Sequence, residues 1–167
     1  MEGKKSKLRA LLVFGAPCSG KTAFAEKFAK KFDLAYYDFA ELKNTEKLSR
    51  KTILLFLTLL ARTRKTLVIE GGIGTEKERT EIRNILRAAG YEPALIWVQT
   101  DTATIRTRMK VRYRSVAKAK EVYNSSIESL EAPTEAEKPI ILSGKHTFET
   151  QAKHVLAGLA DADAASK

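Results

Sequence analysis

The sequence predicts an α/β fold of three layers, in which a five-stranded parallel sheet is covered by helices on both faces. The main observation is that short apolar runs alternate with segments of helical spacing along the chain. The runs that we expect to form strands are 8–14, 34–37, 66–69, 94–98 and 140–142. A second observation is a glycine-rich loop that joins the first of these runs to the first helical segment, as in other strand–loop–helix units.

Helices are expected in the segments between these runs. We expect them from the glycine-rich loop to Phe32, over 45–63, over 75–90, as one long helix from 102 onward, and through 148–159. The clearest start is at Thr75, which forms a capping-box pattern with Glu78. Asp101 is the expected cap of the long helix. The segment 131–138, with Pro133 and three glutamates, is interpreted as a surface loop.

The composition describes one folded domain of ordinary size. The 167 residues are 44% hydrophobic and 30% charged, which is typical of proteins with a buried core. We expect a core of about 8–159 in a single domain that comprises the whole chain, with frayed ends at 1–6 and 160–167. The most apolar stretch, 53–61, is too short to cross a membrane, so no membrane partner is expected. The single cysteine, Cys18, excludes an internal disulfide framework, and the chain is interpreted as cytoplasmic.

The glycine-rich loop has the phosphate-binding pattern G-x-x-x-x-G-K-[ST], known as Walker A. It comprises Gly15, Ala16, Pro17, Cys18, Ser19, Gly20, Lys21 and Thr22. Its glycines let the backbone curl so that N–H groups face the β- and γ-phosphates of a nucleotide. Lys21 adds a positive charge, Thr22 offers a hydroxyl to Mg²⁺, and the following helix adds its N-terminal dipole. The loop therefore predicts that the protein binds ATP together with Mg²⁺.

Two carboxylates follow strands that end at the same edge of the sheet as this loop. Asp38 ends the second strand and Glu70 follows the third, and the carboxyl ends of parallel strands meet at the binding crevice. Phosphoryl transfer needs one carboxylate to accept the proton of the acceptor hydroxyl and another to hold Mg²⁺ or its water. We assign the first role to Asp38 and the second to Glu70. The alternative for each is a helix cap or a solvated loop residue.

A run of cations is the third feature. Seven lysines and arginines lie between 106 and 120, with no acidic residue before Glu121. Arg108 and Arg112 are one helical turn apart and face the same way, so they are predicted to clamp the transferred phosphoryl group. The alternatives are a solvated basic face or a contact surface for RNA phosphates. The net charge of +10 favours an anionic partner without identifying it.

These residues together resemble the small P-loop kinases of the adenylate-kinase-like group, in particular an AAA-type branch of predicted kinases. That branch includes polynucleotide 5′-kinase domains, zeta-toxin-like kinases and antibiotic phosphotransferases. The resemblance covers about 8–159 and rests on the glycine-rich loop, Asp38, 70–72, Arg108, Arg112 and 131–141. It implies a P-loop NTPase fold, an acceptor-binding or proton-accepting role for Asp38, and a mobile lid of about 106–125 that carries both arginines.

The sequence departs from this group at several positions. Cys18 stands where many relatives carry glycine, and Ala23 stands where a second hydroxyl is frequent. Phe39 follows Asp38 where polynucleotide kinases commonly have a basic residue nearby, which disfavours a nucleic-acid acceptor. Glu70 stands where relatives often have the shorter aspartate, which weakens its assignment beside the metal.

The residues and the resemblance predict an ATP- and Mg²⁺-dependent kinase that transfers the γ-phosphoryl group to a hydroxyl of a small molecule or nucleotide. The predicted catalytic residues are Lys21, Asp38, Arg108 and Arg112, and the residues predicted beside the metal are Thr22 and Glu70. Three alternatives stay open: a polynucleotide or RNA 5′-hydroxyl kinase, a toxin-type kinase acting on a sugar nucleotide, and a nucleotide-binding module without transfer activity. The sequence does not identify the acceptor.

Overall fold

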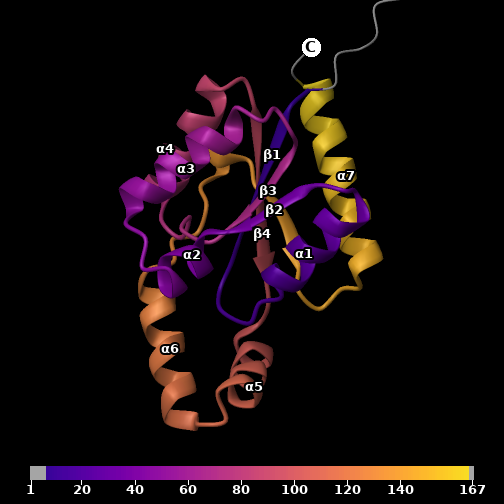
Figure 1. Ribbon diagram of the computed structural model, residues 1–167. Helices are drawn as coiled ribbons and strands as arrows, with labels where there is room; N and C mark the ends of the chain where they lie inside the picture. Colours follow the sequence, from indigo (N-terminus) through magenta and orange to yellow (C-terminus); the bar gives the residue numbers. More distant parts are fainter. Residues whose placement is uncertain (1–6, 166–167) are drawn as a thin grey trace, which may run out of the picture.

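Five parallel strands form one sheet in the order β2-β3-β1-β4-β5 (Figure 1). The structure is a computed structural model that describes residues 7–165. The strands are β1 (Arg9–Phe14), β2 (Ala35–Asp38), β3 (Leu67–Glu70), β4 (Glu92–Gln99) and β5 (Ile140–Ser143). This sheet confirms the predicted α/β fold with five parallel strands.

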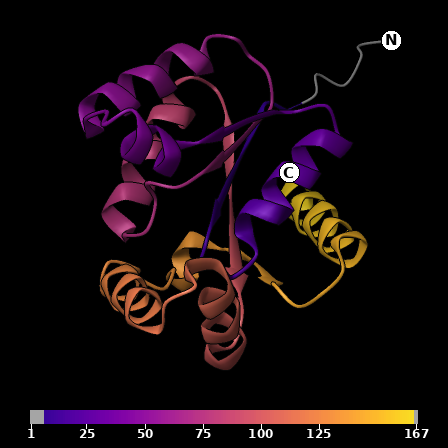
Figure 2. The ribbon, with the colours of Figure 1, turned by 60° about the horizontal axis from the view of Figure 1, so that its bottom comes forward.

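Helices connect the strands and cover the sheet. They are α1 (Lys21–Lys31), α2 (Phe39–Thr45), α3 (Arg50–Ala61), α4 (Glu76–Ala88), α5 (Thr102–Tyr113), α6 (Val116–Glu128) and α7 (Phe148–Ala164), with a short 3-10 helix at Glu135–Glu137. Figure 2 shows α3 and α4 on one side of the sheet and α1 and α7 on the other. The helices thus supply the two outer layers that the sequence predicts.

Apolar side chains alternate along β1 and so build one core on each face of the sheet. Ala10, Leu12 and Phe14 face a core shared with α3 and α4, whereas Leu11 and Val13 face a core shared with α1 and α7. Because both faces are covered, the strand is apolar from Ala10 onward, which is the pattern of a fully buried parallel strand. This burial fixes the position of the loop that follows β1.

The predicted helix over 45–63 corresponds to α3, and the helix α2 before it was not predicted. α2 begins directly after β2, because the Asp38 carboxylate accepts hydrogen bonds from two N–H groups of its first turn. α3 begins after Ser49, whose hydroxyl accepts a hydrogen bond from the N–H of Thr52. The prediction placed the start of α3 too early and missed α2, because it followed the apolar spacing and overlooked these two caps.

The predicted single helix from 102 onward is a hairpin of α5 and α6. Asp101 caps α5 as predicted, but Arg114 then adopts a left-handed conformation with φ of 50°, and Ser115 caps a second helix. The chain turns at this point, and α5 and α6 lie together beyond one end of the sheet (Figures 1 and 2). The basic run over 106–120 is therefore divided between two helices.

The segment 131–138 is more than the predicted surface loop. It contains the 3-10 helix, and Glu137 is only 7% exposed. The fully buried Arg79 of α4 donates hydrogen bonds of 2.7 and 2.9 Å to the Glu137 carboxylate and one of 3.0 Å to the carbonyl of Glu131. A buried charge requires such partners, so Arg79 anchors the chain shortly after α6.

The C-terminal helix is longer than the sequence suggests. α7 continues to Ala164, so the expected fraying over 160–167 is wrong for 160–164. Residues 1–6 and 166–167, the other positions where fraying is expected, lie outside the described residues. In the described part of the chain, no helix is both long and apolar enough to cross a membrane.

Candidate functional site

The glycine-rich loop lies between β1 and α1 and packs tightly against the sheet. Gly20 precedes α1 with φ of 102°, a conformation that favours glycine. A side chain at Gly15 would collide with the backbone carbonyl of Val98 in β4. Ser19 is fully buried, and its hydroxyl has no hydrogen-bond partner among the described residues. The loop is therefore a fixed turn that places Lys21 and Thr22 in the first turn of α1.

Glu70, at the end of β3, contacts three residues around this loop. Its Oε1 accepts a hydrogen bond of 2.6 Å from the Thr22 hydroxyl and lies 3.7 Å from the Lys21 ammonium. Its Oε2 accepts a hydrogen bond of 3.0 Å from the Tyr36 hydroxyl. Glu70 is 2% exposed. The structure thus brings together three of the predicted site residues and adds Tyr36, which the sequence analysis did not assign.

Burial and hydrogen bonding act in opposite directions on the Glu70 carboxyl. Burial raises its pKa above the ordinary value of 4.5, and the hydrogen bond from Thr22 and the charge of Lys21 offset part of this rise. The pKa of Tyr36 is raised as well, first by burial and then by the negative charge of Glu70. The phenol therefore keeps its proton and remains the donor to Glu70.

Thr22 and Glu70 present a hydroxyl and a carboxylate oxygen that suit Mg²⁺. This ion prefers oxygen ligands, retains several waters and is commonly held by one or two carboxylates together with substrate phosphates. The described residues contain no group of three or more His, Cys, Asp or Glu side chains that could cage a metal ion. The pair therefore fits a metal ion that arrives with a nucleotide.

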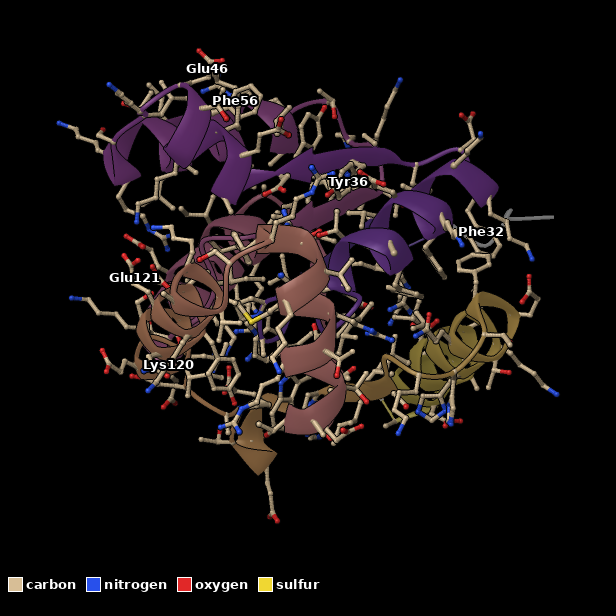
Figure 3. All side chains as sticks on the ribbon, turned by 90° about the horizontal axis from the view of Figure 1, so that it is seen from below. Phe32, Tyr36, Glu46, Phe56, Lys120 and Glu121 are labelled. Carbon is tan, nitrogen blue, oxygen red and sulfur yellow. The ribbon has the colours of Figure 1, made fainter. Side chains whose placement is uncertain are left out.

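Asp38 lies next to Glu70 in the sheet but in a different environment. The two residues are register partners of β2 and β3. The Asp38 Oδ1 accepts hydrogen bonds from the N–H groups of Ala40 (2.8 Å) and Glu41 (3.0 Å), which is the helix-cap alternative considered for this residue. Asp38 also lines a cavity of about 360 Å³ on the α2 and α3 side, where Figure 3 labels Phe56. One carboxylate oxygen is thus used by the cap, and Oδ2 makes no hydrogen bond among the described residues.

Arg108 ties α5 to the glycine-rich loop. Its Nη1 donates to the carbonyls of Cys18 (3.1 Å) and Ser19 (3.4 Å), and its Nη2 donates to the carbonyl of Gly144 after β5 (3.1 Å). Arg112 lies one turn further along and is exposed. Arg112 lines the same cavity as Arg108 and Lys21, so both predicted arginines lie at the loop side of α5.

A cavity of about 480 Å³ lies between the loop, α5 and the connection from β5 to α7. Its lining includes Lys21, Thr22, Arg108, Arg112, His146 and Phe148. This volume is within the range of pockets that bind small molecules. A larger cavity of about 870 Å³ lies over β4 and β5 and contains none of Lys21, Thr22 and Glu70, so size does not mark the phosphate site. His146 and Phe148 were not assigned to the site from the sequence.

The predicted site residues lie in a region that matches a known protein family. A family described as an AAA domain matches residues 11–136, from β1 into the 3-10 helix. The chain belongs to this AAA domain family. The matched region contains the glycine-rich loop, both carboxylates and both arginines of the predicted site. No curated protein matches the chain.

Solved structures, among them two kinases, share the fold of this AAA domain. A gluconokinase from Sinorhizobium meliloti is 17% identical, with a TM-score of 0.68 and 93% of each chain covered. The APS kinase CysC of Mycobacterium tuberculosis, in complex with AMPPNP and APS, is 18% identical, with a TM-score of 0.66 and coverage of 92% of this chain and 98% of the other. Kti12 of Chaetomium thermophilum, in complex with ADP-AlF3, is 16% identical, with a TM-score of 0.66 and coverage of 91% and 97%. The chain therefore has a kinase-like P-loop NTPase fold.

Proposed function

We propose that this AAA domain protein is an ATP- and Mg²⁺-dependent kinase that transfers the γ-phosphoryl group to a hydroxyl of a small molecule or nucleotide. The observation that carries the proposal is the contact set of Lys21, Thr22 and Glu70, with Arg108 and Arg112 lining the cavity above it. Simple nucleotide binding requires the loop, whereas transfer also requires cations over the phosphates. The kinase fold of the similar solved structures supports the same conclusion.

The nucleotide would lie along the start of α1, with its phosphates on the N–H groups of the loop and on Lys21. The 480 Å³ cavity would hold the nucleotide, with His146 and Phe148 beside the base and Arg108 beside the phosphates. Mg²⁺ bound by Thr22 and Glu70 would neutralise charge on the phosphates. Arg112, which is exposed in this structure, would contact the transferred group when the lid closes.

In the transfer step, the acceptor hydroxyl oxygen forms a bond to the γ-phosphorus while the bond to the β–γ bridging oxygen breaks and ADP leaves. The hydroxyl proton passes to Asp38, whose Oδ2 is not used by the helix cap. Arg108 and Arg112 stabilise the charge that develops on the transferred oxygens. Closure of the lid excludes water and so limits hydrolysis of ATP.

The test is a transfer assay with ATP labelled in the γ-phosphate and a panel of sugars, nucleosides, nucleotides and 5′-hydroxyl oligonucleotides. We expect label in at least one acceptor, and loss of that label in Asp38→Asn at unchanged ATP affinity. ATP binding without transfer to any member of the panel would instead favour a nucleotide-binding module. Wild-type ATP affinity in Lys21→Ala would contradict the assignment of the loop itself.

A further inference from the structure

The lid hairpin, defined here as α5 and α6, carries cations on two opposite sides. Arg108 and Arg112 line the cavity of the glycine-rich loop, whereas Arg106 and Lys110 line a separate groove against α6. Each pair is four residues apart, and positions 106 and 108 differ by about 200° around the helix axis. The outer pair is therefore directed away from the proposed phosphates, and the proposed kinase reaction leaves it without a role.

The groove between the two helices has a volume of about 370 Å³. Lys120 of α6 adds a third cation to its rim, and Met109 and Ala119 form a floor that is 1% and 6% exposed. Tyr123 forms one wall, with the Arg106 guanidinium 5.9 Å from the centre of its ring. Figure 3 views the molecule from the side of α5 and α6 and labels Lys120 on α6. The groove therefore combines three cations with an apolar floor and an aromatic ring.

The positive charge of the lid is not balanced by acidic side chains. Residues 102–128 contain seven basic and two acidic residues, a net charge of +5 out of +10 for the whole chain. Among the described residues, the ion pair within this hairpin joins Lys118 to Glu121 (3.2 Å), and none is formed by Arg106, Lys110 or Lys120. Such unbalanced, exposed charge attracts an anionic partner.

We propose that this outer groove binds the phosphate backbone of single-stranded nucleic acid, with a base stacked on Tyr123. Arg106 and Lys110 lie along one helix face, and the positive surface continues to the tip of the hairpin at Arg114 and Lys118. This surface is longer than one small phosphorylated molecule needs, and it matches a chain of phosphates. A positively charged groove with an aromatic ring is the general arrangement for binding single strands.

An anionic lipid surface fits these observations less well. Membrane-bound helices bury a continuous apolar face with bulky residues. On the lid, the strongly exposed apolar side chains at the tip are Val111 (76% exposed) and Val116 (67% exposed), and the groove floor lies below the cations. The binding that we propose also does not depend on which hydroxyl receives the phosphoryl group, because Lys21, Thr22 and Glu70 do not line the groove.

The experiment measures the binding of a fluorescein-labelled, unstructured single-stranded RNA to the full chain by anisotropy at several salt concentrations. If three phosphates are contacted, the plot of log K against log salt loses about two units of slope in Arg106→Gln/Lys110→Gln/Lys120→Gln, and affinity falls about tenfold or more at low salt. The matched control is Lys51→Gln/Lys77→Gln/Arg87→Gln, which removes the same charge from exposed positions of α3 and α4. This control is expected to retain most of the affinity and slope.

Further arms separate this proposal from the kinase proposal and from other partners. Lys21→Ala and saturation with Mg²⁺-ATP are expected to leave RNA binding unchanged, so failure of one proposal does not decide the other. Tyr123→Leu keeps the groove apolar and is expected to weaken binding several-fold through lost stacking. Equal losses in the groove variant and in the matched control would overturn the proposal. The proposal would also be overturned if polyglutamate or phosphatidylserine vesicles bound as tightly as the RNA and the groove variant abolished that binding.

Discussion

The junction between the glycine-rich loop and β3 differs from the lid hairpin in how its charges are held. At the junction, Glu70 is 2% exposed and both of its oxygens accept hydrogen bonds beside Lys21. On the lid, Arg112 and Lys120 are exposed and form no ion pair with a described carboxylate. The junction is thus arranged before any ligand binds, whereas we propose that an anion completes the lid. Changes at the junction should act at any salt concentration, and changes on the lid should depend on salt.

The largest effect is expected from Lys21→Ala at the junction. Loss of the ammonium removes the fixed charge beside the phosphates, and we expect kcat/KM for phosphoryl transfer to fall by about 10³-fold. Steady-state kinetics with the acceptor found in the panel measures this change. Lys30→Ala, on the exposed side of the same helix, is the control and should retain activity. A fall that vanished at high salt would contradict the comparison between the two regions.

The ion pair of Arg79 and Glu137, which anchors the chain after the lid hairpin, is buried like Glu70 at the junction. Removing one of its partners should therefore have a large effect. Arg79→Met removes both guanidinium hydrogen bonds from the buried Glu137 carboxylate and leaves it the Thr134 N–H and Arg83 at 3.8 Å, so we expect the free energy of unfolding to fall by about 3 kcal/mol. Arg79→Met/Glu137→Met removes both charges and should be less destabilised than the single variant. Arg87→Met, exposed on the same helix, should change stability by less than about 0.5 kcal/mol. Urea unfolding measures all three.

The same ion pair predicts how stability depends on pH. The hydrogen bonds from Arg79 lower the pKa of Glu137 below its ordinary value of 4.5. A carboxyl whose pKa is lower in the folded state stabilises the fold above its unfolded pKa, and this contribution is lost as pH falls through the folded pKa. Wild-type stability should therefore drop more steeply below pH 4.5 than that of Arg79→Met/Glu137→Met. Parallel curves for the two proteins would rule out this assignment.

The sheet and the loop are predictable from sequence because local signals and burial agree there. The apolar runs place the strands to within a few residues, and G-x-x-x-x-G-K-[ST] requires its position after β1. The capping box at Thr75 is also found as predicted. The start of α3 at Arg50 and the break at 114–115 were missed because single side chains, Ser49 and Ser115, decide them. The signal of such a cap covers only one or two residues, whereas the apolar periodicity that competes with it extends along the whole helix.

Contacts between distant segments were harder to predict. Arg79 and Glu137 are 58 positions apart, and each alone has the pattern of an exposed charge. Tyr36 could have been noticed, because it is two residues before Asp38 and so shares its face of β2. Its hydrogen bond to Glu70 depends on the pairing of β2 with β3, which the sequence does not specify. Sequence therefore predicts which residues reach the edge of the sheet, and the structure determines which of them touch.

A smaller effect is expected when the two arginines of the inner lid face are compared. Arg108→Ala removes hydrogen bonds to two carbonyls of the glycine-rich loop and to that of Gly144, and should weaken ATP binding as well as transfer. Arg112→Ala should lower kcat by about 10²-fold with little change in the KM for ATP, because this side chain reaches the nucleotide only after closure. Arg106→Ala, on the outer face of the same helix, is the control and should match wild type in both constants. Equal loss of ATP affinity in all three variants would mean that the lid acts only through its overall positive charge.

The smallest effect, and the sharpest test of the junction, is expected for Tyr36→Phe. This change removes one hydrogen bond to Glu70 and keeps the ring, so the carboxylate is less firmly oriented. We expect a rise of up to about tenfold in the Mg²⁺ concentration needed for half-maximal ATP binding. The lost bond favoured the charged form of Glu70, so the pKa of Glu70 rises further and the acid limb of kcat/KM moves to higher pH. Tyr37→Phe, whose ring packs on Phe56, is the control and should move neither quantity. An unchanged acid limb in Tyr36→Phe would mean that burial and Thr22 alone hold the charge of Glu70.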